Sequence, residues 1–321
     1  MGKLIEGVWV SEGYGSDSRG HFVRDETSFH NAVMADGSNG YRAEAGRYHL
    51  YVSLACPWAQ RTLLGRSLKG LEQAISVSVV HPHMGEQGWT FLEYPGAHPD
   101  TVNHARYLHE IYTKAKPDYS GRVTVPVLWD IRGETIVCND SRMVLRMLSR
   151  EFDAFARSEV DLCPAALETD IDRAIDALYG PVNNGVYRAG FATTQAAYED
   201  SVRELFEALD GYERLLAGRR YLLGARFTEA DICLFTTLLR FDAVYHYHFK
   251  CNLRRLSDYP VLSAYLRDIY QMPGVAALCS FDHIKRHYFS SHPHLNPNGI
   301  IPLGPVQDLT APANREAVDR N

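Results

Sequence analysis

The stretch from Tyr48 to Leu71 constrains the fold most, because its hydrophobic period changes from that of a strand to that of a helix. Residues 48–53, Tyr-His-Leu-Tyr-Val-Ser, alternate aromatic and β-branched or aliphatic side chains, as strands do. Pro57 suits the first turn of a helix because it lacks an N–H, and leucines at helical spacing follow it. A strand that leads directly into a helix is the first half of a β-α-β unit.

The elements that follow complete an α/β domain. In chain order we expect a strand at 75–80, a long polar excursion at 82–121, strands at 124–130 and 135–138, and a helix at 141–150. This order predicts one sheet with crossover helices, an α/β domain of the thioredoxin type. We place it at residues 46–150. The preceding residues 1–45 are rich in Gly, Ser, Asp and Asn and predict an irregular N-terminal extension.

The second half of the chain has a purely helical pattern. Apolar residues predict helices over 167–178, 198–216, 231–249 and 262–270. Thr228 with Asp231 three residues later forms a capping box before the third of them. We therefore predict a linker at residues 151–165, an all-α domain at 166–290 and a C-terminal tail at 291–321.

Composition excludes several classes of function. The chain has 321 residues and a formal net charge of −6, without the basic excess typical of nucleic-acid binders. No apolar run reaches the roughly 20 residues that span a bilayer, and the N-terminus lacks the apolar core of a secretory signal. Six cysteines without a C-x-x-C pair are too sparse for a disulfide scaffold. We expect a cytoplasmic enzyme with free thiols that binds neither nucleic acid nor membrane.

Cys56 differs from the other cysteines because it lies between the first strand and the first helix. A helix N-terminus presents unpaired N–H groups and about half a positive charge, which stabilises a thiolate. A buried structural cysteine would occupy the same place, and position alone favours neither interpretation. Residue 59 is alanine, so a dithiol cycle is excluded and a reactive Cys56 needs an external thiol.

Two other segments could bind a ligand. Pro126 precedes an apolar strand, where a thioredoxin-type domain commonly has a cis proline that exposes the preceding backbone; an edge-strand proline is the alternative. Residues 139–141, Asn-Asp-Ser, precede a helix and could bind an anion or amine, or form an ordinary N-cap. The histidines predict no metal site, since only His283 and His287 have helical spacing and no H-E-x-x-H motif accompanies them.

Besides the two-domain order, the chain contains six characteristic local sequences, which extend from the first domain to the tail. They are Tyr-His-Leu-Tyr at 48–51, Cys-Pro-Trp-Ala at 56–59, Gly-Trp-Thr-Phe at 88–91, Gly-Arg-Val-Thr-Val-Pro-Val-Leu-Trp-Asp at 121–130, Asn-Asn-Gly-Val-Tyr at 183–187 and Asn-Pro-Asn-Gly-Ile-Ile-Pro at 296–302. The chain thereby resembles the glutathionyl-hydroquinone reductases, the Xi-class glutathione transferases. The resemblance implies the glutathione transferase fold, an extension and tail that belong to that fold, and a homodimer.

The resemblance also implies roles for individual residues. It implies that Cys56 is the nucleophile and that Tyr187 and Tyr288 face the quinol, although a tyrosine at either position, taken singly, is more often structural. It implies a glutathione site made by Trp89, Arg122, the backbone of Val125, Asp140 and Ser141. The family usually has Glu-Ser where this chain has Asp140-Ser141; aspartate keeps the charge for the γ-glutamyl amine on a side chain that is one methylene shorter.

The implied activity is the glutathione-dependent removal of glutathione from S-glutathionyl-(chloro)hydroquinones through a Cys56–glutathione mixed disulfide. Glutathione is then the co-substrate, and no metal takes part. An omega-like thioltransferase or dehydroascorbate reductase would use the same cysteine on disulfides or small oxidants. A non-enzymatic, transferase-like ligand-binding protein is a third interpretation, and it predicts that alkylating reagents label Cys56 slowly.

Overall fold

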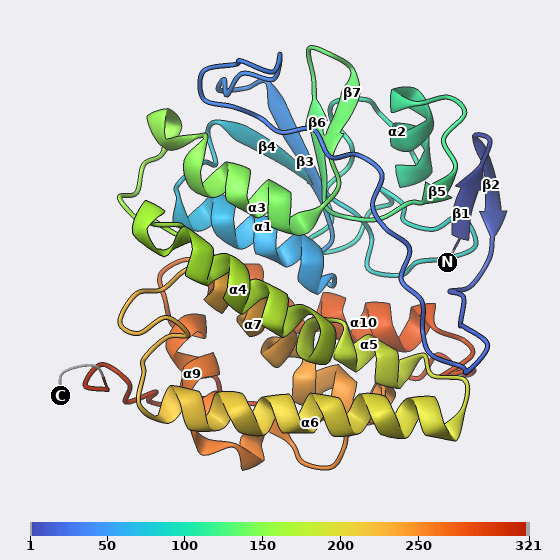
Figure 1. Cartoon of the computed structure of the whole chain (residues 1–321). Helices are drawn as coiled ribbons and strands as arrows, with labels where there is room; N and C mark the ends of the chain where they lie inside the picture. Colours follow the sequence, from blue (N-terminus) through green and yellow to red (C-terminus); the bar gives the residue numbers. More distant parts are fainter. Residues whose placement is uncertain (1, 319–321) are drawn as a thin grey trace. The chain divides into compact units, whose positions relative to one another are not determined.

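The computed structural model describes residues 2–318, which divide into two units (Figure 1). Unit 1 comprises residues 2–13, 25–161 and 280–299, and unit 2 comprises residues 14–24, 162–279 and 300–318. Within the described residues, no helix has the length and apolar character needed to cross a bilayer.

Unit 1 is built on a four-stranded sheet in the order β4-β3-β6-β7. Its strands are β3 (Tyr48–Val52), β4 (Ile75–Val79), β6 (Val127–Asp130) and β7 (Thr135–Cys138). β3 runs parallel to β4 and antiparallel to β6, and every residue of β3 is buried, which explains its strongly apolar sequence. The prediction of an α/β domain with a β-α-β start is confirmed.

Two helices of unit 1, α1 (Pro57–Leu68) and α3 (Ser141–Arg150), pack closely against each other (Figure 1). Gly65 lies at their contact, where a Cβ would come within 2.7 Å of Leu145 Cδ1 and displace the end of that side chain. A third helix, α10 (Phe281–Ser291), also groups with this unit, although we expected it with the all-α domain.

The extension and the polar excursion hold more regular structure than we predicted. Residues 2–11 form a hairpin of β1 (Gly2–Ile5) and β2 (Val8–Ser11), and β1 also pairs with β5 (Gly121–Arg122). The turn residues Glu6 and Gly7 have φ values of 47° and 78°, as a tight hairpin turn requires. The excursion contains α2 (Leu108–Ala115), which contacts β7.

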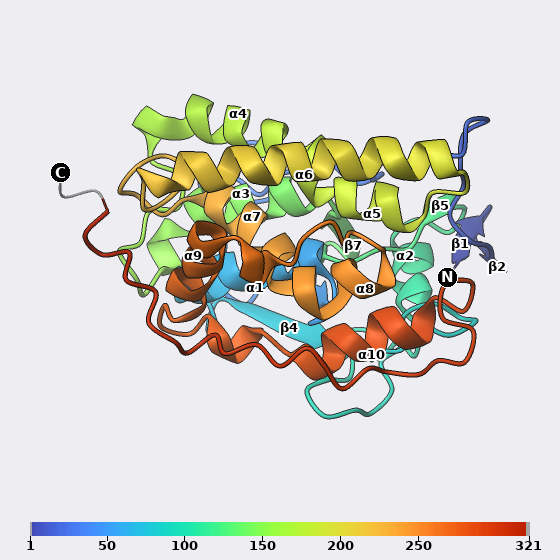
Figure 2. The ribbon, with the colours of Figure 1, turned by 90° about the horizontal axis from the view of Figure 1, so that it is seen from below.

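Unit 2 is helical, as predicted. Its helices are α4 (Glu168–Leu178), α5 (Gly185–Gly190), α6 (Gln195–Ala217), α7 (Glu229–Arg240), α8 (His246–His248) and α9 (Pro260–Tyr270). Both α5 and α9 contact α6, and Figure 2 shows α5 alongside it. The helix expected over 231–249 is instead α7, a π-helical turn at Phe241–Tyr245 and α8.

Every residue of α7 is buried, and its N-terminus carries the predicted capping box. Asp231 Oδ2 accepts hydrogen bonds from the backbone N–H and the hydroxyl of Thr228, at 2.8 and 3.1 Å. Its Oδ1 accepts from Leu222 N and from the Tyr265 hydroxyl, each at 2.8 Å. One carboxylate therefore connects the start of α7 to the loop before it and to α9.

Candidate active site

Cys56 is the N-cap residue of α1, in extended conformation with φ −79° and ψ 122°. Its carbonyl accepts the helical bond from Gln60 N at 3.0 Å, and Pro57 occupies the first turn, so the local fold is the one the sequence predicts. Cys56 is half-buried, whereas the other five cysteines are buried. Desolvation raises the pKa of the Cys138 thiol to about 12, which makes that thiol inert near neutral pH.

The Cys56 thiol donates to the carbonyl oxygen of Val125, with Sγ and O 3.7 Å apart. The peptide between Val125 and Pro126 is cis, as we expected for a thioredoxin-type domain. The structure therefore brings two of the predicted site residues into contact, the proposed nucleophile and the backbone that would pair with a bound peptide.

A residue that sequence reasoning missed, Tyr112 of α2, fixes the loop beside Cys56. Its hydroxyl donates to Thr124 O at 2.8 Å and accepts from Thr124 N at 3.2 Å and Asn139 Nδ2 at 3.1 Å. The ring is fully buried, and desolvation raises the pKa of the phenol. One hydroxyl thus connects the segment before Pro126 to the residue before Asp140.

Replacing Tyr112 with phenylalanine should lower the unfolding free energy by about 1–3 kcal/mol, because buried groups on Thr124 and Asn139 lose their partner. We also expect weaker glutathione binding, measured by titration calorimetry alongside a urea midpoint. Tyr198→Phe is the matched control, since its hydroxyl bonds Lys250 O in a part-exposed setting in unit 2. Wild-type affinity in Tyr112→Phe would contradict a role in shaping the site.

The other residues that the resemblance assigns to glutathione belong to unit 1, and two of them have close partners. Trp89 is 4% exposed and stacks on His287, with ring centroids 4.7 Å apart. Arg122 donates from Nε to Asp25 Oδ2 at 2.8 Å. Its Nη1 and Nη2 donate to the carbonyls of Glu12 and Gly13, at 2.9 and 2.7 Å. The extension therefore orients this guanidinium.

Asp140 and Ser141 lie at the start of α3. Asp140 is the N-cap, and its Oδ1 accepts from Met143 N at 2.8 Å. This contact matches the N-cap alternative for residues 139–141, and it commits one carboxylate oxygen to the helix. Ser141 is the first helical residue and is buried. Both residues lie at the positive end of the α3 dipole, where negatively charged groups are favoured.

The two candidate quinol tyrosines lie in different units. Tyr288 lies in α10 of unit 1, is 1% exposed, and packs edge-on against His287 and His292. Tyr187 lies in unit 2 and is 8% exposed. We expected Tyr187 in a broken stretch between helices, but it belongs to the short helix α5.

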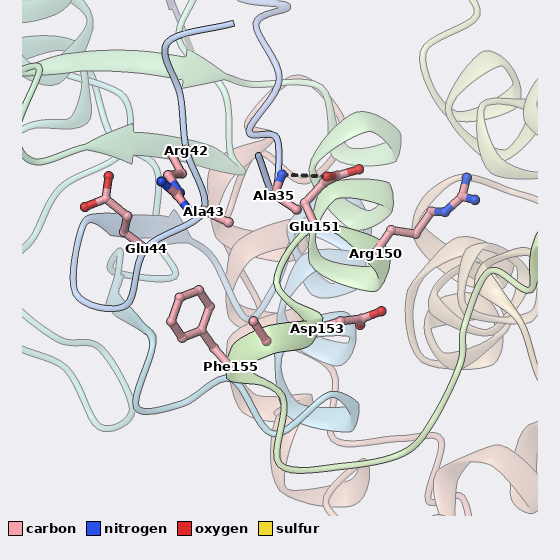
Figure 3. A pocket seen from close by; sticks show the side chains of 9 residues that line it. Ala35, Arg42, Ala43, Glu44, Arg150, Glu151, Asp153 and Phe155 are labelled. Carbon is pink, nitrogen blue, oxygen red and sulfur yellow. Dashed lines mark hydrogen bonds between the residues drawn. The ribbon is translucent and has the colours of Figure 1, made fainter. Parts of the chain in front are cut away.

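A cavity of about 280 Å³ in unit 1 provides no alternative active site (Figure 3). Nine residues from segments 35–44 and 150–155 line it, and none of the predicted site residues is among them. Its acidic side chains have other partners: Glu44 binds Arg47 and Arg132, and Asp153 binds Lys69. Between residues 2 and 318, no group of three His, Cys, Asp or Glu side chains could hold a metal ion.

Comparison with known proteins identifies the relatives of this chain. Residues 55–151 match the family model of the glutathione S-transferase N-terminal domain, and residues 195–268 match that of the C-terminal domain. The chain is 53% identical to the glutathionyl-hydroquinone reductase YqjG of Escherichia coli, over 98% of this chain and 99% of that protein. It is 50% identical to the glutathionyl-hydroquinone reductase PcpF of Sphingobium chlorophenolicum, over 96% of this chain and 98% of that protein.

Comparison with solved structures indicates the same family. The glutathione-bound structure of Escherichia coli YqjG has a TM-score of 0.90 at 52% identity, covering 97% of this chain and 98% of that one. The Xi-class glutathione transferase of Natrialba magadii has a TM-score of 0.93 at 50% identity, and the match covers 98% of this chain and 96% of that one. The chain therefore belongs to the glutathionyl-hydroquinone reductases, the Xi class of the glutathione transferases.

Proposed function

We propose that this chain removes glutathione from S-glutathionyl-hydroquinones, chlorinated ones included, with Cys56 as the nucleophile. The observation that carries the proposal is the half-buried Cys56 at the start of α1, next to the cis Val125–Pro126 peptide, while the other cysteines are buried. The 53% identity to a glutathionyl-hydroquinone reductase supports the choice of substrate.

In the first step, the Cys56 thiolate attacks the sulfur of the glutathionyl adduct. A Cys56–glutathione disulfide forms and the carbon–sulfur bond breaks, so the ring carbon keeps the electron pair and, having taken up a proton, carries hydrogen in place of sulfur. The two sulfurs are oxidised and the ring is reduced by two electrons. Tyr187 and Tyr288 donate hydrogen bonds to a ring oxygen and stabilise the keto tautomer or the enolate that develops.

In the second step, a glutathione thiolate attacks the mixed disulfide, frees Cys56 and leaves as oxidised glutathione. We assign the glutathione site to Trp89, Arg122, the Val125 backbone, Asp140 and Ser141. The Val125 backbone, next to the cis peptide, pairs with the peptide backbone of glutathione. The start of α3 receives the γ-glutamyl group, with Asp140 facing its amine.

We further propose that the enzyme is a cytoplasmic homodimer, as its family resemblance implies. Light scattering of the purified chain measures the oligomeric state directly.

The test is mass spectrometry of the protein after incubation with a glutathionyl-hydroquinone and no free glutathione. We expect one glutathione on the Cys56 peptide and one equivalent of released hydroquinone, and added glutathione should then yield oxidised glutathione and the free enzyme. The absence of the adduct, with no hydroquinone released, would contradict the proposal. Faster turnover of a small glutathione mixed disulfide than of the quinol adduct would instead support an omega-like thioltransferase.

A further inference from the structure

Arg24, in the part of the N-terminal extension that belongs to unit 2, lies against the candidate quinol residue Tyr187. The Arg24 guanidinium carbon is 4.8 Å from the centroid of the Tyr187 ring. Its Nε donates to Asn184 Oδ1 at 2.7 Å. Asn184 is the N-cap of α5 and Tyr187 is the third residue of that helix, so one guanidinium contacts two side chains of the same turn.

The backbone around Arg24 is fixed in place by several contacts within unit 2. Thr193 N donates to Gly20 O at 3.0 Å, and Thr194 Oγ1 donates to Arg19 O at 2.7 Å. Phe22 is buried, with its ring centroid 5.3 Å from that of Phe191, the residue that follows α5. Because the segment is held at residues 19, 20 and 22, Arg24 is presented to Tyr187 by the chain itself.

The position of the cation affects the chemistry of the phenol. A guanidinium near the face of an aromatic ring is attracted to its negative quadrupole, by about 0.5–2 kcal/mol depending on solvation. The same positive charge stabilises the negative charge that develops on the phenol oxygen when the hydroxyl donates, and so makes the O–H a stronger hydrogen-bond donor. The bond to Asn184 holds the Arg24 guanidinium in place. Phe249 and Tyr245 pack against the Tyr187 ring, at centroid distances of 5.5 and 6.0 Å, and restrict it further.

We infer that Arg24 is a positioning residue for Tyr187: it orients the phenol and strengthens its hydrogen bond to the ring oxygen of the quinol. This inference rests on the proposed function, in which Tyr187 contacts the quinol. The thiol–disulfide step at Cys56 uses no ring oxygen, so Arg24 should matter for carbon–sulfur cleavage much more than for disulfide exchange.

The experiment compares two substrates in the full-length enzyme, an S-glutathionyl-hydroquinone and the mixed disulfide of glutathione with 2-mercaptoethanol. In Arg24→Gln, the kcat for the quinol adduct divided by the kcat for the mixed disulfide should fall about tenfold. The KM for the quinol adduct should stay within about twofold of wild type. Arg24→Lys keeps the positive charge but lacks the planar guanidinium group, and it should recover part of the kcat that Arg24→Gln loses. Arg19→Gln is the matched control, because its side chain in the same segment is 80% exposed.

A double-mutant cycle with Tyr187→Phe isolates the coupling, since Arg24→Gln should have no further effect once the hydroxyl is gone. An equal loss on both substrates, or an undiminished effect in the Tyr187→Phe background, would overturn the inference. Failure of the wild-type enzyme to act on the quinol adduct would instead overturn the proposed function, so the two failures are distinguishable.

Discussion

Replacement of Cys56 by alanine should lower kcat/KM for S-glutathionyl-hydroquinones by at least about 10³-fold, because no other group can form the mixed disulfide. The remaining thiols offer no substitute, since they are buried. Steady-state release of hydroquinone measures the effect. Serine at this position should be equally inactive, because its hydroxyl stays protonated and cannot form a disulfide.

Cys163→Ala is the matched control, because this residue is 2% exposed and lies outside the proposed site. It should keep near-wild-type turnover. Iodoacetamide gives an independent readout: native wild type should take up one equivalent near neutral pH, and Cys56→Ala should take up none. Substantial turnover in Cys56→Ala would contradict the assignment of the nucleophile, and slow labelling of Cys56 would favour the non-enzymatic interpretation.

Replacement of Asp231 by alanine should lower the unfolding free energy by about 3 kcal/mol or more. The carboxylate accepts from two backbone N–H groups and two hydroxyls in a fully buried setting. Each orphaned buried donor costs about 1–3 kcal/mol, and the loss of a cap alone costs about 1 kcal/mol. The urea midpoint and the melting temperature are the measurements.

Asp200→Ala provides the control for that variant, since its side chain is 61% exposed on α6 and pairs loosely with Arg203. We expect a change within about 0.5 kcal/mol there. If Asp231→Ala unfolds at the same urea concentration as Asp200→Ala, the capping box is not a major source of stability in unit 2.

The regular core of both units could be predicted because its signals are local. β3 is buried throughout, and its alternating aromatic and aliphatic side chains predict a strand. The α1 residues Leu63 and Leu64 mark a buried helix face. The hairpin at residues 2–11 was missed because its second strand has no buried face, and β1 is held by β5, more than 110 residues away. Such pairing leaves no periodic pattern in the sequence.

The prediction for α5 failed for a similar reason. Gly185 and Gly190 are poor helix formers, so the stretch around Tyr187 reads as broken. Packing overrides this preference, since a Cβ at residue 190 would lie 2.2 Å from Phe249 Cγ. Glycine is required there by close approach, and the helix is stabilised by its neighbours.

In the candidate site, too, the residues with a local sequence signature could be predicted and the others could not. The Cys56–Pro57 junction and the Val125–Pro126 segment carry local signatures, so sequence reasoning found them. Tyr112 and Arg24 carry none, because each acts on residues distant in the chain: Arg24 contacts Asn184, 160 positions away. The chain has 19 tyrosines, and Arg24 lies in an irregular segment, so neither residue stands out in the sequence.

The bond between Arg19 and Thr194 spans 175 positions of the chain, and this separation has a consequence for biosynthesis. A ribosome that adds about 5–20 residues per second needs about 9–35 s to cover that interval. During this time Phe22 and Arg24 have emerged while their partners at 184–194 are still unsynthesised. This early segment therefore docks only after more than half of the chain has been made, and nascent chains arrested before residue 194 should remain open to proteolysis near residue 20.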